Sequence, residues 1–131
     1  MIAVDTNVLV RLLVKDDEAQ TRKVVRLFRR LDADRERAYV SDVVICEVVW
    51  VLRAAYGFSR SEVSAVLAKV LTARQLGFDS TERLARALHA YETGKGDLAD
   101  YVIGEHAVAA GCNVVVTFDK TLLRADGFAS P

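Results

Sequence analysis

Short apolar runs alternate with longer segments of helical periodicity along this chain, and this alternation limits its fold more than any other feature. The run at 2–5 is too short for a helix, and those at 37–41 and 113–117 have strand-like composition. Strands separated by helices pair in parallel through right-handed crossovers, with helices on both faces of the sheet. The sequence therefore predicts a three-layer α/β domain in which a small parallel sheet is flanked by helices.

The helical segments carry recognisable start and stop signals. Capping-box patterns begin at Asp17, Ser59 and Asp79, and Gly57 and Gly111 follow the last periodic residues of two other segments. Together with the apolar periodicity, these signals predict helices at 7–15, 17–31, 43–56, 59–73, 81–91 and 97–110, and a short helix or turn at 120–125.

Composition supports one folded domain over residues 1–131. The chain is 52% hydrophobic and 27% charged, with 18 basic and 18 acidic residues, which excludes both a disordered chain and a broadly basic nucleic-acid binder. Cys46 and Cys112 lack the spacing of a zinc or redox motif, so we expect a reduced, cytoplasmic protein. Glu47 and Arg53 interrupt the longest apolar stretch before it could span a bilayer, so no membrane contact is expected.

Two acidic residues follow predicted strands. Asp5 ends the first strand and Asp119 comes directly after the last. Ligands of an open parallel sheet gather beyond the carboxyl ends of its strands, so both carboxylates face one crevice if these strands are neighbours. The alternative for each is an ordinary loop acid or a helix N-cap, and Asp5 is well placed to cap the helix that follows it.

Glu47 is the one acidic residue in the apolar segment 43–52. Burying an unpaired carboxylate there is costly, so we expect Glu47 either to be paired or to face a polar cavity that holds a cation. Arg53 is a candidate partner, but it lies six positions away and is poorly placed on the helix face.

Asp97 and Asp100 lie three positions apart at a predicted helix start, so their side chains share one face. A helix dipole also favours acids there, and the alternative is that Asp97 is the N-cap and Asp100 a surface acid. Thr117 lies two residues before Asp119, so in an extended segment its hydroxyl points the same way and can orient a carboxylate or a water.

These five carboxylates include no histidine or cysteine, and grouping them requires a cation. Oxygen donors alone select a hard ion, Mg²⁺ or Mn²⁺, and such ions support phosphoryl chemistry through an activated water. The chain carries no catalytic triad, phosphate-binding glycine loop or dinucleotide motif that would indicate another reaction.

The order and spacing of four short motifs resemble the PIN-domain family of metal-dependent ribonucleases, specifically the VapC-type toxins of toxin–antitoxin pairs. The motifs are Val4–Leu9, Val43–Leu52 with Glu47, Asp97–Asp100 and Val116–Asp119. Gly127 and Phe128 add to the resemblance, which covers essentially the whole chain.

The resemblance implies an acidic metal quartet of Asp5, Glu47, Asp100 and Asp119, with Asp97 as an additional acid and Thr6, Asn7 and Thr117 in support. It also implies Mg²⁺ or Mn²⁺, endonucleolytic cleavage of structured RNA such as tRNA or rRNA, a homodimer, and inhibition by a cognate antitoxin. Whether one or two ions bind, and which of Asp97 and Asp100 is a direct ligand, stays open.

Two other functions compete with this one. A phosphotransfer receiver domain has a similar length, but it requires paired acids after the first strand and a lysine after a late one, an arrangement that this chain lacks. A PIN-like module that binds RNA or a partner without catalysis is the second alternative, and the presence of every matching acid argues against it.

A basic helix face is a separate feature. Arg22, Arg26 and Arg29 follow helical spacing, with Lys23 and Arg30 beside them. An ordinary solvated face is the interpretation that we favour, and contact with an RNA backbone is the alternative.

Overall fold

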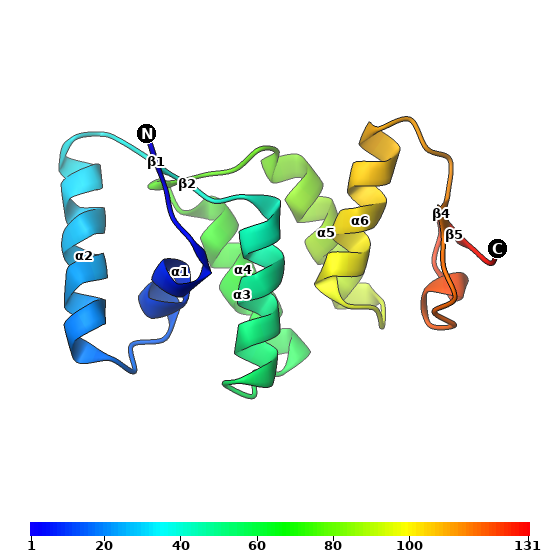
Figure 1. Cartoon of the computed structure of the whole chain (residues 1–131), viewed down its shortest axis with the longest axis horizontal. Coiled ribbons are helices and arrows are strands. Elements are labelled where there is room, and N and C mark those ends of the chain that lie inside the picture. Colours follow the sequence, from blue (N-terminus) through cyan, green and yellow to red (C-terminus); the bar gives the residue numbers. More distant parts are fainter. The chain divides into compact units, whose positions relative to one another are not determined.

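The computed structural model describes residues 1–131, which divide into two units, Met1–Asp79 and Ser80–Pro131 (Figure 1). Each unit has its own parallel strands and its own helices, and each is described separately below. No helix in the chain has the length and apolar character needed to cross a membrane.

The first unit contains a three-stranded parallel sheet in the order β1-β2-β3. Its strands are β1 (Ile2–Ala3), β2 (Ala38–Tyr39) and β3 (Leu76–Gly77). Ala38, at the centre of the sheet, lies opposite Ile2 on one side and Leu76 on the other. The strands predicted at 2–5 and 37–41 are confirmed in shorter form. Strand β3 was not predicted, because Leu76 and Gly77 do not lie in a run of apolar or β-branched residues.

Four helices accompany this sheet: α1 (Thr6–Leu13), α2 (Glu18–Ala33), α3 (Asp42–Ala54) and α4 (Arg60–Thr72). Helix α1 packs against α2 and α3, and α3 packs against α4. Leu9, Ile45, Leu52 and Leu67 are almost completely buried in this core. The predicted capping box of Ser59 is confirmed in both of its hydrogen bonds.

The second unit pairs β4 (Val115–Val116) with β5 (Phe128–Ala129) in parallel, and a 3-10 turn (Leu122–Arg124) lies between them in sequence. Helices α5 (Thr81–Thr93) and α6 (Leu98–Ala109) pack against each other. The predicted cap of α5 is wrong by one residue. Ser80 accepts the hydrogen bond from the Arg83 N–H, whereas Asp79 accepts one from the Tyr39 hydroxyl.

Helices and parallel strands alternate along the chain, so the predicted α/β class is confirmed. The strands form two small sheets rather than one. The partner of β1 is β2 and the partner of β4 is β5, so Asp5, after β1, and Asp119, after β4, belong to different units.

Candidate active site

Asp5 occupies the turn between β1 and α1. Its backbone is extended, and its Oδ1 accepts a hydrogen bond of 3.1 Å from the backbone N–H of Val8. Asp5 is therefore the N-cap of α1, which begins at Thr6 and not at Asn7. The cap uses one carboxylate oxygen and leaves Oδ2, on an exposed side chain, without a protein partner. Capping and ligand binding are thus compatible at this residue.

Glu47 lies on α3, where that helix packs against α1. The Thr6 hydroxyl donates a hydrogen bond of 2.7 Å to Glu47 Oε2, and this bond joins residues 41 positions apart in sequence. Asn7, the next residue of α1, is exposed and makes no hydrogen bond through its side chain. The first unit therefore brings Asp5, Thr6 and Glu47 to the start of α1, and we call these residues the first acid cluster.

The prediction that Glu47 lies in a buried environment is wrong. Glu47 is exposed in the structure, as are its neighbours on the same helix face, Val43 and Trp50, with exposures of 66% and 70%. Arg53 is not its partner, because Arg53 donates to the carbonyl oxygen of Phe58 instead. Although the sequence of α3 is apolar around the whole helix, α3 buries only the side that carries Ile45, Val48 and Leu52. Glu47 forms no ion pair with any basic side chain.

Asp97 and Asp100 lie at the start of α6. Asp97 is the N-cap residue, and its backbone N–H donates a hydrogen bond of 3.0 Å to Asp100 Oδ2. Asp100 is half-buried, and this burial raises the pKa of its carboxyl group. The hydrogen bond from Asp97 opposes the rise, while the negative charges of Asp97 and Asp119 add to it. Asp97 and Asp119 are thus both close enough to Asp100 to repel its carboxylate.

Asp119 is held in a tight turn after β4. Its backbone N–H donates to Thr117 Oγ1 at 3.0 Å, and its Oδ1 accepts from the backbone N–H of Thr121 at 2.8 Å. Thr117 therefore orients Asp119 through the backbone and not through the carboxylate. Thr121 was missed, although an aspartate two residues before it is the usual pattern of such a turn. Asp97, Asp100 and Asp119, with Thr117, form the second acid cluster.

Neither cluster contains a basic partner. The ion pairs of the structure are elsewhere, and none of the five acids takes part in one. No three of the chain's carboxylates, imidazoles and thiols form a metal-binding group in the structure. The donor chemistry nevertheless suits a hard divalent cation, because the donors are all carboxylate oxygens and no basic side chain pairs with them.

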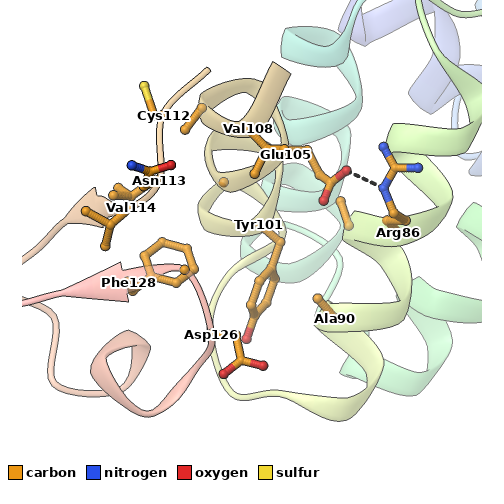
Figure 2. Close-up of a pocket in the computed structure, with 15 residues that line it drawn as sticks. Arg86, Ala90, Tyr101, Glu105, Val108, Cys112, Asn113, Val114, Asp126 and Phe128 are labelled. Atoms are coloured by element: carbon orange, nitrogen blue, oxygen red, sulfur yellow. Dashed lines mark hydrogen bonds and ion pairs between the residues drawn. The ribbon is translucent and has the colours of Figure 1, made fainter. Parts of the chain in front are cut away.

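The hollows of the two units are separate from the acid clusters. In the second unit a cavity of about 150 Å³ lies among α5, α6, β4 and β5, beside the ion pair of Arg86 Nε with Glu105 Oε1 at 2.6 Å (Figure 2). In the first unit a cleft of about 790 Å³ is lined by Arg35, Arg37 and Arg74 among others. None of the predicted site residues lines either hollow, so the candidate site is identified by its charge and not by a cavity.

Comparisons with known proteins agree with the motif pattern. The family model of the PIN domain matches residues 2–128, a range that includes every residue of both acid clusters. A VapC ribonuclease of Aquifex aeolicus (strain VF5) is 24% identical over 120 residues, which are 92% of this chain and 88% of that protein. The predicted family resemblance and the three-layer α/β fold that it implies are thereby confirmed.

Proposed function

This chain belongs to the PIN-domain family, and we propose that it is a divalent-metal-dependent endoribonuclease that acts as the toxin of a toxin–antitoxin pair. The observation that carries the proposal is the set of five acids without ion-pair partners, all within the matched range. The similarity to a VapC ribonuclease supports the reaction class.

We propose that Asp5, Glu47, Asp100 and Asp119 are the ligands of Mg²⁺ or Mn²⁺, with Asp97 as an additional acid. Such an ion, when bound, supplies a water of lowered pKa and polarises a phosphodiester. Binding a cation would also lower the pKa of Asp100, which is raised first by burial and then by the charges of Asp97 and Asp119.

The supporting residues hold the donors in place. Thr6 fixes one oxygen of Glu47, the Asp97 N–H fixes one oxygen of Asp100, and the Thr117 hydroxyl fixes the backbone of Asp119. Oriented ligands reduce the reorganisation that metal binding requires. Asn7 is exposed next to Thr6, so its side chain is free to contact a ligand or substrate.

The proposal extends to substrate and partners. We expect structured RNA such as tRNA or rRNA as the substrate, a cognate antitoxin as the inhibitor, a homodimer, a cytoplasmic location, and one nuclease domain formed by residues 1–131. A PIN-like module that binds RNA or a partner without catalysis is the competing proposal, and it predicts binding without cleavage.

Cleavage of purified tRNA and rRNA, with mapping of the new 5′ ends by sequencing, tests both proposals. We expect cuts at defined positions with Mg²⁺ or Mn²⁺, loss of cutting in EDTA, and loss in Asp5→Asn and Asp100→Asn. Asp34→Asn removes an exposed acid at the end of α2, far from either cluster in sequence, and serves as the matched control. Cleavage that persists in both Asp5→Asn and Asp100→Asn would contradict the proposed site. RNA binding without any cleavage would favour the non-catalytic module.

A further inference from the structure

Helix α2 carries a cationic face that the proposed nuclease site does not use. At about 100° per residue, its basic positions fall within an arc of about 120°, opposite the buried Val24, Phe28 and Leu31. All the members of this α2 basic face are exposed; they are Arg22, Lys23, Arg26, Arg29 and Arg30.

None of these side chains has a partner in the protein. The arginines that do form ion pairs, Arg11, Arg74 and Arg86, lie elsewhere in the chain. Glu18 and Asp34 lie four positions from Arg22 and Arg30, a suitable spacing for ion pairs, yet neither pair forms. The positive charge of the α2 basic face is therefore uncompensated.

The spacing of these basic residues lowers the stability of helix α2. Arg26 lies three or four positions from each of the other four basic residues, and like charges at those separations destabilise a helix. A helix face whose only role is to keep the protein soluble typically alternates positive and negative charges. In a chain whose net charge is zero, this concentration of cations needs an anionic partner to offset its cost.

The composition of the face indicates which partner fits. Four of its five cations are arginines, whose planar guanidinium groups bind phosphate oxygens in a bidentate manner. No large apolar side chain on α2 is exposed, whereas protein interfaces bury an apolar centre. A phosphodiester backbone therefore suits this surface better than a protein segment does.

We propose that the α2 basic face binds the sugar–phosphate backbone of the RNA substrate. This inference rests on the proposed function, since it concerns how the same substrate is held. Contacts of this kind carry affinity and orientation without reading the sequence, and their strength falls steeply with salt concentration.

The test measures binding of a fluorescein-labelled RNA stem-loop by anisotropy in EDTA, over a range of salt concentrations. The triple variant Arg22→Gln, Arg26→Gln, Arg29→Gln is compared with Lys15→Gln, Lys69→Gln, Arg124→Gln, which removes the same charge from exposed positions elsewhere. We expect the α2 variant to bind at least about tenfold more weakly than the control variant, with a salt slope smaller by about 2.

Thermal unfolding of the same variants separates binding from folding. Since glutamine removes the repulsion around Arg26, we expect the α2 variant to be at least as stable as the parent. Weakened RNA binding in a protein of equal or higher stability supports the proposal. A large loss of stability that accounts for the weaker binding would overturn it.

Three further outcomes would overturn the inference: no RNA binding by the parent, equal losses in both triple variants, or tighter binding of a polyglutamate peptide that depends on the same arginines. The last would identify an acidic protein segment as the partner. Failure of the nuclease proposal is distinguishable, because it appears as no cleavage by the parent protein in Mg²⁺, whereas RNA binding by the α2 basic face is measured without metal.

Discussion

The hydroxyl of Thr6 donates a hydrogen bond of 2.7 Å to Glu47, across the contact between α1 and α3. This bond lies within the first acid cluster, where it joins α1 to α3 at an exposed site. Its net contribution to stability is therefore small, about 0.5–1 kcal/mol. Its value is in fixing one oxygen of Glu47.

Thr6→Val removes this hydroxyl and keeps the side-chain volume. We expect a loss of no more than about 1 kcal/mol in the free energy of unfolding, together with about a tenfold loss of RNA cleavage rate because Glu47 is no longer held. Thr6→Ser restores the hydroxyl and should restore the rate. Urea unfolding and cleavage assays give the two readouts, and equal rates in all three proteins would contradict a positioning role for Thr6.

Asp5 combines a structural and a proposed metal-binding role, and two substitutions separate them. Asn keeps an N-cap acceptor for the Val8 N–H, whereas Ala removes it. We expect Asp5→Ala to cost about 1 kcal/mol of stability and Asp5→Asn much less, while both abolish cleavage. Chemical denaturation of the two variants in EDTA checks the first claim. If Asp5→Asn cleaves RNA at the parent rate, the residue is a cap and nothing more.

Asp100 makes stability depend on pH in a predictable direction. Its pKa is raised in the folded chain, chiefly by burial, so the stability it contributes is present below the unfolded pKa and is lost as pH rises through the folded value. At neutral pH the ionised Asp100 carboxylate therefore lowers the free energy of unfolding. We expect Asp100→Asn to stabilise the metal-free protein at pH 7 by no more than about 0.5 kcal/mol, because solvent screens the group, and to have no effect near pH 3.

Glu62 provides a control of opposite sign for that experiment. The Ser59 backbone N–H lowers its pKa, so its contribution is present above the unfolded pKa and is lost as pH falls through the folded value. Glu62→Gln should therefore lower stability at neutral pH and have little effect in acid. Denaturation curves of both variants at the two pH values test the signs, and a matching sign at neutral pH would refute the argument.

Arg35 ends α2 in a conformation that favours glycine. Its φ is 55°, and the N–H groups of Arg35 and Glu36 donate back to the carbonyls of Asp32 and Leu31, the two bonds of a Schellman motif. An L-residue pays about 1–2 kcal/mol for this backbone conformation. We expect Arg35→Gly to raise the free energy of unfolding by about 1 kcal/mol, measured by thermal or urea denaturation. A fall in stability would show that the Arg35 side chain has a stabilising contact in solution.

The sequence predicted the features that depend on near neighbours in the chain. The helices and the Ser59 capping box were predictable because their signals lie within a few residues. The strands β3 and β5 were not, because neither lies in a run of apolar or β-branched residues and each exists through its partner strand. The exposure of Glu47 was also beyond the sequence, since it depends on which side of α3 the neighbouring helices cover.

Three of the proposed metal ligands are oriented by backbone groups that lie very close to them in sequence. Asp5, Asp100 and Asp119 each accept a hydrogen bond from a backbone N–H no more than three residues away. The orientation of each carboxylate is set when the adjacent turn forms, and it is kept when the tertiary packing loosens. Glu47 differs, since its partner is 41 residues distant. Among these four acids, Glu47 is the one whose alignment drifts first when α1 shifts against α3.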